Sequence, residues 1–121
     1  MLAQMFELRK DYIYALAKAR PAAALPDPVD LSSKDGQRQI RDLALRGVEE
    51  VFEALGLLRN TKVHRATEIP DFDREHFLEE WVDAFNFFFS VLIKAGYTPQ
   101  ELFDMYAKKD AIIHERLRNG Y

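Results

Sequence analysis

The segment from residue 73 to residue 96 constrains the fold more than any other part of the chain, because its apolar residues recur with the period of an α-helix and leave little of the helix surface polar. The apolar members are Phe77, Leu78, Trp81, Val82, Phe85, Phe88, Phe89 and Leu92. On a helical wheel they cover well over half of the circumference, whereas a surface helix needs an apolar stripe only somewhat wider than about 100°. We therefore predict that this helix packs on several sides, against other helices of the chain and against a second subunit.

The other long segments also have helical spacing, and none shows the alternation of a β-strand. We predict helices from about residue 2 to 19, from about 33 to 58, from 73 to 96, and from 98 to just before 120. Asp73 is the expected N-cap and Gly96 the expected C′ residue of the third helix. The run Thr98-Pro99-Gln100-Glu101 has the composition of a capping box and starts the fourth helix.

The connections complete the predicted architecture. Pro21, Pro26 and Pro28 predict an extended connection after the first helix, because proline lacks the backbone donor that a helix interior needs. A polar loop from Arg59 to Phe72 separates the second and third helices. Four helices with short connections indicate an all-α, four- to five-helix bundle-like fold that spans residues 1–121 as a single domain.

The charge balance and the absence of cysteine exclude several classes of protein. The 121 residues include 17 Lys and Arg and 20 Asp and Glu, for a net charge of −3. This balance argues against binding to duplex nucleic acid. Because no cysteine is present, disulfide scaffolds, thiolate metal sites and thiol nucleophiles are excluded. The sequence shows no signal peptide and no apolar stretch long enough to span a membrane, so we expect a cytoplasmic protein.

A narrow polar strip remains on the third predicted helix. It consists of His76, Glu79, Glu80, Asp83, Asn86 and Ser90. Glu80 and Asp83 are three positions apart, so they project from one side of the helix and could share a ligand. Carboxylates on so apolar a helix are costly unless a partner neutralises them. The alternative is that the strip simply faces solvent.

A second acidic run, residues 49–53, lies on the second predicted helix. Glu50 and Glu53 share a face through the same spacing. An ordinary solvated face is the alternative here, since the wheel places Glu53 opposite the apolar centre and Glu50 at its border. If the two pairs faced one another, four carboxylates would supply the hard oxygen ligands that Mg²⁺ prefers.

A magnesium site of this kind binds substrate phosphates, and phosphates require cations nearby. The candidates are Lys62, Arg65, Lys109 and Arg116. Each of them could instead be a solvated surface charge. Other catalytic patterns are absent from the sequence: there is no H-E-x-x-H, no phosphate-binding G-x-x-x-x-G-K-[ST] loop, no G-x-G-x-x-G and no G-x-S-x-G.

The two acidic motifs, Glu49-Glu50-x-x-Glu53 and Glu80-x-x-Asp83, resemble the E-E-x-x-E…E-x-x-D signature of the all-α NTP pyrophosphatases. This superfamily contains the MazG-like and dimeric dUTPase proteins. The stretch FLEEWVDAFNFFF, from Phe77 to Phe89, is similar to the dimeric dUTPase pattern F-x-E-E-L-x-D-A-L-H-F-F. The loop from Arg59 to Thr67 and the tail from Ala95 to Tyr121 continue the similarity, which is weaker over the first third of the chain.

The resemblance implies the all-α NTP pyrophosphatase fold and the hydrolysis of a nucleoside triphosphate to its monophosphate and pyrophosphate. The implied metal ligands are Glu50, Glu53, Glu80 and Asp83, which would hold Mg²⁺ or, as a substitute, Mn²⁺. Glu50 or Glu53 would help to activate the attacking water. The implied phosphate-binding residues are Lys62, Arg65, Lys109 and Arg116. Members of this family are commonly dimers with sites at the subunit interface, which implies a homodimer or a higher homo-oligomer.

The chain departs from the dimeric dUTPase pattern where the family contacts the base and sugar. Arg9 stands where the family has a glutamine that reads the uracil edge, and Asn86 stands where it has a histidine. In the last helix, Asp110 and Ile113 replace the two asparagines of K-N-x-x-N-x-x-R. Arg9, Asn86 and Asp110 are therefore the candidate base or sugar contacts.

These features lead to one leading hypothesis and two alternatives. The leading hypothesis is a Mg²⁺-dependent pyrophosphohydrolase with dUTP as the first candidate substrate. The first alternative is the same chemistry on another dNTP, such as dCTP, or on a modified nucleotide. The second alternative is a non-catalytic helical interaction module that retains the fold.

Overall fold

The computed structural model of the chain describes residues 1–120, and that range contains α-helices, one short 3₁₀ turn and no β-strand. The elements are α1 (Leu2–Ala19), η1 (Pro21–Ala23), α2 (Lys34–Leu55), α3 (Arg74–Lys94) and α4 (Pro99–Arg118). The all-α prediction is confirmed. Tyr121, with which the similarity of the tail ends, lies outside the described residues.

Three of the four α-helices, α2, α3 and α4, begin at side chains that accept from free backbone N–H groups. Ser33 Oγ accepts from the N–H of Gly36 at 2.9 Å at the start of α2. The Asp73 carboxylate accepts from the N–H of His76 at 3.0 Å at the start of α3. A full capping box between Thr98 and Glu101 starts α4. The predicted N-caps at Asp73 and Thr98 are confirmed, because short polar acceptors placed before an apolar run specify a helix start locally.

The helix ends follow the same local rules. Gly96 has a φ of +90° and donates to Ile93 O at 3.0 Å, while Tyr97 donates to Leu92 O at 2.9 Å. This is the pair of hydrogen bonds of a Schellman motif, so the predicted C′ role of Gly96 is confirmed. The second helix ends at Leu55, three residues earlier than predicted, because Gly56 follows it and the chain turns there.

The connection between α1 and α2 differs from the extended segment that its prolines predict. It opens with the 3₁₀ turn η1, because a proline at the first position of a helix has a suitable φ and loses no hydrogen bond. The chain is extended at Ala24. Val29 is buried, and its N–H donates to Lys94 O at 2.7 Å, which holds this connection against the end of α3.

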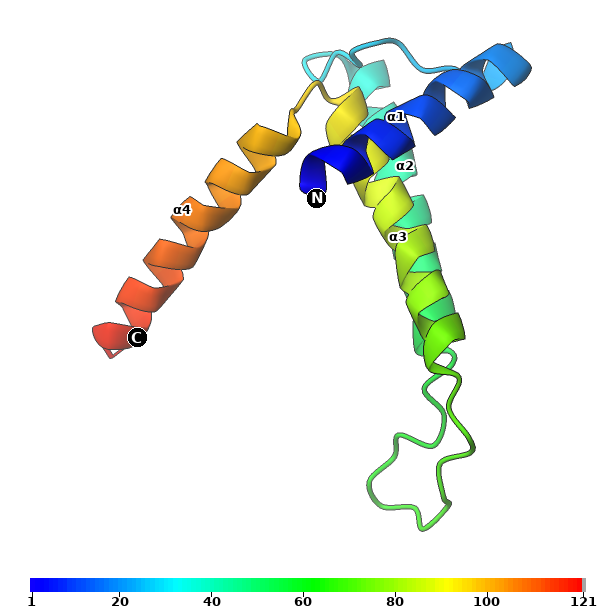
Figure 1. Cartoon of the computed structure of the whole chain (residues 1–121), viewed down its shortest axis with the longest axis vertical. Helices are drawn as coiled ribbons and strands as arrows, with labels where there is room; N and C mark the ends of the chain where they lie inside the picture. Colours follow the sequence, from blue (N-terminus) through cyan, green and yellow to red (C-terminus); the bar gives the residue numbers. More distant parts are fainter. Residues whose placement is uncertain (121) are drawn as a thin grey trace.

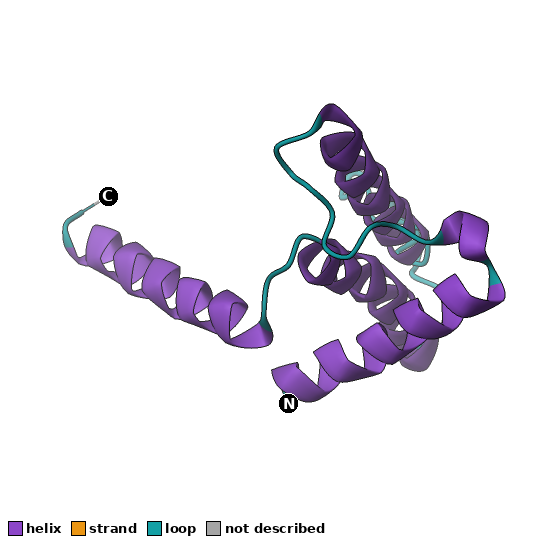
Figure 2. Ribbon diagram, turned by 90° about the horizontal axis from the view of Figure 1, so that it is seen from above, coloured by secondary structure: helices purple, strands orange, loops and turns teal. Residues whose placement is uncertain are grey.

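The helices α2 and α3 form an antiparallel pair, and α1 crosses α3 (Figure 1). The helix α4 leaves the end of α3 and runs away from that pair, as the second view also shows (Figure 2). Within residues 1–120, α4 contacts no helix except α1. In the described residues α3 contacts both α1 and α2, but α1 and α2 do not contact each other, so one chain does not close the predicted bundle.

Aromatic side chains follow α3 along its length. Ring contacts link Phe77 to Trp81, Trp81 to Phe85 and Phe85 to Phe89 at centroid separations of 6.1, 6.4 and 5.9 Å. The ring centroid of Phe89 then lies 5.2 Å from that of Phe6, the fully buried residue of α1. These rings join α1 to α3, although Trp81 itself is only half-buried.

The polar strip of α3 does not simply face solvent, because Glu80 is half-buried and Ser90 is buried. Some large apolar side chains of α3 are exposed on the helix surface instead. They are Leu78, Val82 and Phe85. None of the helices in the described range is long and apolar enough to cross a membrane.

We predict that Gly47→Ala destabilises the protein, because the ring of Phe88 on α3 packs directly against Gly47 of α2. A Cβ added there would lie 2.5 Å from a ring carbon of Phe88. Overpacking outweighs the better helix propensity of alanine, so the free energy of unfolding should fall by about 1–2 kcal/mol. Chemical denaturation measures the change.

The matched control for this prediction is Gly56→Ala. The nearest atom to a Cβ at Gly56 is Glu53 O at 3.3 Å, and the glycine has an ordinary right-handed conformation. This variant should change the free energy of unfolding less. If Gly47→Ala proved as stable as the original protein, the tight contact between Gly47 and the Phe88 ring would be contradicted.

Candidate metal centre and adjoining pocket

Three carboxylates from two helices meet on the α2–α3 pair. One oxygen each of Glu50, Glu80 and Asp83 lies within 4.8 Å of the others. The antiparallel packing of the helices brings Glu50 of α2 opposite the two acids of α3. The acidic cluster, as we call these three residues, joins one member of the first predicted pair to both members of the second.

Glu53 lies beside the acidic cluster at its exposed edge. The pKa of Glu50 is raised above its ordinary value, first by loss of solvent around its carboxyl group and then by Glu53. A side-chain hydrogen bond with Glu53 and the negative charge of Glu53 both favour the protonated form of Glu50 over the charged form. The charges of Asp83 and Glu80 contribute further. The three other acids thus lie close enough to act on Glu50, and four oxygen ligands this close together would suit one hard cation.

Glu80 carries the clearest sign of a ligand position for a cation. Its Oε1 lies 3.1 Å from His76 Nε2, one turn earlier on α3. Its Oε2 is buried and has no hydrogen-bond partner within residues 1–120. A buried carboxylate oxygen without a donor is costly, and a bound cation would remove that cost. The donor set of the acidic cluster therefore fits a divalent cation.

The four predicted phosphate-binding cations do not lie against the acidic cluster in one chain. Lys62 and Arg65 are exposed in the loop that extends beyond the ends of α2 and α3 (Figure 1). Lys109 and Arg116 are exposed on α4, which contacts neither α2 nor α3 in the described part of the chain. A complete set of cations around this cluster would therefore need a movement of these segments or a second copy of the chain.

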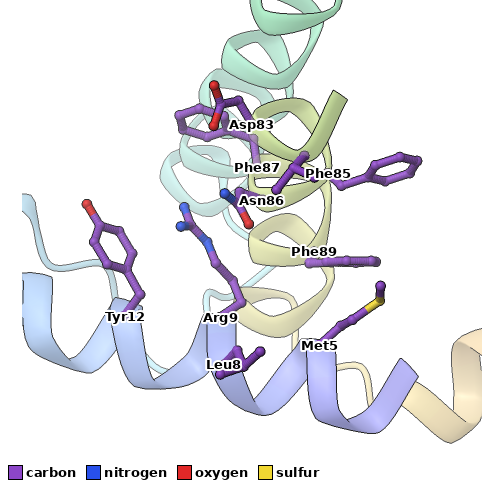
Figure 3. A pocket seen from close by; sticks show the side chains of 10 residues that line it. Met5, Leu8, Arg9, Tyr12, Asp83, Phe85, Asn86, Phe87 and Phe89 are labelled. Atoms are coloured by element: carbon purple, nitrogen blue, oxygen red, sulfur yellow. The ribbon is translucent and has the colours of Figure 1, made fainter. Parts of the chain in front are cut away.

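A pocket of about 790 Å³ between α1 and α3 adjoins the acidic cluster. Asp83 belongs to the cluster and also lines this pocket (Figure 3). Arg9 and Asn86, two of the three predicted base or sugar contacts, line it as well. Asp110 does not, because it lies on α4, where its carboxylate is 3.5 Å from His114 Nε2.

Arg9 is held in place by contacts on both sides. Its Nε donates to Ser90 Oγ at 2.7 Å, and its guanidinium lies 4.6 Å from the ring centre of Tyr12. Burial lowers the pKa of Arg9 from its ordinary value, opposed in part by the charge of Tyr12. Figure 3 shows the side chain rising from α1 toward Asn86. These contacts leave the terminal guanidinium nitrogens able to donate into the pocket.

Sequence reasoning missed the aromatic residues of the pocket. Tyr12 and Phe87 both line it, and Arg9 lies within cation–π distance of both rings. The position of Tyr12, three residues after Arg9, was the available signal, because residues at that spacing share a helix face. Phe87 had no such signal among the many phenylalanines of α3.

Comparisons with known proteins leave the resemblance to rest on the sequence motifs alone. A scan against protein-family models, a search of curated proteins and a search of solved structures each found no match for the chain. The geometry of the acidic cluster is therefore the independent evidence on which a function can be argued.

We predict that a divalent cation stabilises the protein through the acidic cluster. At a Mn²⁺ or Mg²⁺ concentration about 100 times the dissociation constant, binding to the folded state alone should add about 2.7 kcal/mol to the free energy of unfolding. Asp83→Asn should lose most of this increment. It should also be slightly more stable than the original protein without metal, because one of three neighbouring negative charges is gone. Thermal unfolding with and without metal measures both effects.

Glu79→Gln is the matched control for the metal experiment. Glu79 is an exposed acid of the same helix and lies outside the cluster. Its variant should keep the full stabilisation by metal. Equal losses in the two variants would show that metal binds only to the general negative charge of α3.

Proposed function

We propose that the protein is a Mg²⁺-dependent nucleoside triphosphate pyrophosphohydrolase that converts a dNTP to the dNMP and pyrophosphate. The observation that carries the proposal is the convergence of Glu50, Glu80 and Asp83 beside a pocket of nucleotide size. The unpartnered oxygen of Glu80 supports a cation at this point. The two acidic motifs that resemble those of all-α NTP pyrophosphatases support the same chemistry.

Glu50, Glu53, Glu80 and Asp83 would hold the metal, which when bound would withdraw charge from the substrate phosphates. Mn²⁺ should substitute, because it accepts the same oxygen ligands. Glu53, like Asp83, is exposed, so solvent reaches its carboxylate. We assign Glu53, together with Glu50, to orienting the attacking water and accepting its proton.

The reaction exchanges one phosphorus–oxygen bond for another. The water oxygen bonds to the α-phosphorus, and the bond from that phosphorus to the bridging oxygen breaks. Pyrophosphate leaves with the electron pair of the broken bond. The increased charge on the leaving group calls for cations, and Lys62, Arg65, Lys109 and Arg116 are the proposed source.

The pocket between α1 and α3 is the proposed site of the base. Its volume of about 790 Å³ is in the range of small-molecule sites. Tyr12 and Phe87 offer aromatic surfaces, and Arg9 and Asn86 offer polar groups. With Asp83 at its edge, a base in this pocket would leave the phosphates directed toward the acidic cluster. We place Asp110 outside this base site.

The substrate base depends on what Arg9 can donate. The similarity of the third helix to the dimeric dUTPase pattern makes dUTP the first candidate. Arg9, however, only donates hydrogen bonds, whereas glutamine both donates and accepts. The cytosine edge presents two adjacent acceptors, O2 and N3, which suit a guanidinium better than the uracil edge does. This difference favours dCTP as the second candidate, with modified nucleotides as further members of the panel.

We further propose that the protein acts as a homodimer or a higher homo-oligomer. Large apolar side chains are exposed at helical spacing on α2 and α4. They are Leu45, Val48, Phe52 and Leu55 on α2, and Phe103, Tyr106, Ile113 and Leu117 on α4. Faces of this kind mark contact surfaces. A second copy could also place cations of its loop or of α4 near the acidic cluster.

The same exposed faces favour the second alternative, a non-catalytic helical interaction module. That function would need the apolar faces and would not need the acidic cluster. Turnover of a nucleotide that depends on the acidic cluster would exclude it, whereas binding of a helical partner without turnover would support it.

We predict that Glu80→Gln lowers kcat/KM for the preferred dNTP by at least about 100-fold, because one of the proposed charged metal ligands is lost. Release of pyrophosphate from a panel of dNTPs with Mg²⁺ measures the effect. The ratio of kcat/KM for dUTP and dCTP in the same panel decides between the two substrates.

The control for the activity experiment is Glu49→Gln. Glu49 is exposed and adjoins Glu50 in the sequence, but it is not part of the acidic cluster. Its variant should keep activity within about twofold, as expected for an exposed residue without partners. No turnover of any nucleotide by the original protein, or equal losses in both variants, would overturn the proposed function.

For the oligomer, we predict that Phe52→Glu shifts the protein toward the monomer. Phe52 is 67 % exposed on α2, and a charge there would have to be buried in any interface that this face makes. Light scattering should give a mass of at least twice 14.1 kDa for the original protein and a lower mass for the variant. Val63→Glu, at a fully exposed apolar residue of the loop, is the control. A monomeric original protein would contradict the prediction.

A further inference from the structure

A second cavity, of about 550 Å³, shares Arg9 with the proposed base site. It is enclosed by α1, the connection that leads to α2 and the last turn of α3. Arg9, Tyr12 and Phe87 line both cavities. No residue of the acidic cluster lines the second one, so the proposed hydrolysis does not use it.

Lys94 is the residue that distinguishes this cavity. It lines the cavity and is only 7 % exposed. Its ammonium donates to Leu25 O at 3.1 Å and forms no ion pair within residues 1–120. An ammonium has three N–H donors, so this one contact leaves two of them free. A buried cation without a counter-charge is costly, unless an anion completes the site.

The backbone fixes Lys94 at this position. It is the last residue of α3, and its own carbonyl accepts from Val29 N–H at 2.7 Å. The Schellman motif that ends at Tyr97 holds the next turn of chain. The negative end of the helix dipole helps to accommodate the ammonium, but that effect is small beside the cost of burying an unpaired charge. The ammonium is thus held in position before any ligand arrives.

The other charges around the cavity favour an anion. Arg9 and Lys10 also line it, while Asp27 is its one acidic lining residue. Asp27 is exposed, and its Oδ2 accepts from the Tyr14 hydroxyl at 3.4 Å at the outer edge. Lys10 likewise lies at the surface, 3.7 Å from Glu7. The buried charge of the cavity is therefore the positive charge of Lys94, whereas its one carboxylate belongs to the exposed Asp27.

The remaining walls are apolar or aromatic. They include Ile13, Leu16, Leu25, Phe87, Ile93 and Tyr97. A wall of this composition with one buried charge is typical of sites for small organic molecules. We propose that this cavity binds a small organic anion whose carboxylate or phosphate group pairs with Lys94 and whose apolar or aromatic body packs on these walls. This site stands independently of the proposed hydrolysis.

The experiment is an NMR titration of the full chain, with the backbone amide signals of residues 25, 94 and 97 as the readout. Benzoate and phenyl phosphate are the two organic probes, and they distinguish a carboxylate from a phosphate ligand. Inorganic phosphate tests whether the anion suffices without the apolar body. We expect saturable shifts with at least one organic probe, and at least about tenfold weaker binding of uncharged benzamide than of benzoate.

Two variants test the role of the buried charge. Lys94→Gln keeps a donor for Leu25 O but removes the charge, and it should weaken binding of the organic anion by at least about tenfold. Lys18→Met removes an exposed positive charge of α1 that does not line the cavity, and it should change binding by no more than about threefold. The amide spectrum of each variant shows whether it is folded.

The proposal fails if no anion shifts these signals in a saturable way, or if Lys94→Gln binds as tightly as the original protein. It also fails if benzamide and benzoate bind equally, a comparison that needs no variant and so stands even if Lys94→Gln does not fold. Loss of nucleotide hydrolysis in the acidic-cluster variants would not affect these outcomes.

Discussion

The close contact between α2 and α3 determines where the chemical groups of this protein lie. The two helices meet through small buried residues, Gly47 and Ala54 on α2 and Ala84 on α3. Because Gly47 has no side chain, the ring of Phe88 on α3 lies directly against the backbone of α2 at that point. Glu50 lies between the two small residues of α2, so the same close packing brings its carboxylate to the acids of α3. A larger residue at Gly47 would thus loosen both the packing and the acidic cluster.

This packing gives α3 an unusual distribution of polarity. Part of its polar strip faces the other helices, with Glu80 half-buried and Ser90 buried. Its apolar residues Leu78 and Val82 face outward. The arrangement is unfavourable for an isolated chain on both counts, because charge is partly enclosed and apolar surface is exposed. A cation at the acidic cluster and a second subunit over the apolar faces would relieve the two costs separately.

Local signals in the sequence were sufficient to predict the helices, because caps act within a few residues of a helix end. Asp73, Thr98 and Gly96 all have their predicted roles. The convergence of the acidic pairs was harder to predict. A helical wheel shows which side chains share a face, but the face that meets another helix depends on packing, and here Gly47 and the small alanines decide it. The orientation of α4 could not be predicted, since an apolar stripe indicates that a helix face is buried but does not identify the element or subunit that buries it.

Lys94 and Arg9 illustrate a further limit of sequence reasoning and also connect the two cavities. A lysine at the end of a helix is ordinarily read as a favourable interaction with the helix dipole, so nothing in the sequence marks Lys94 as buried. Arg9 is held between Ser90 and Tyr12 and lines both cavities. Because these contacts fix the guanidinium beside both cavities, its positive charge acts on the proposed base site and on the proposed anion site alike.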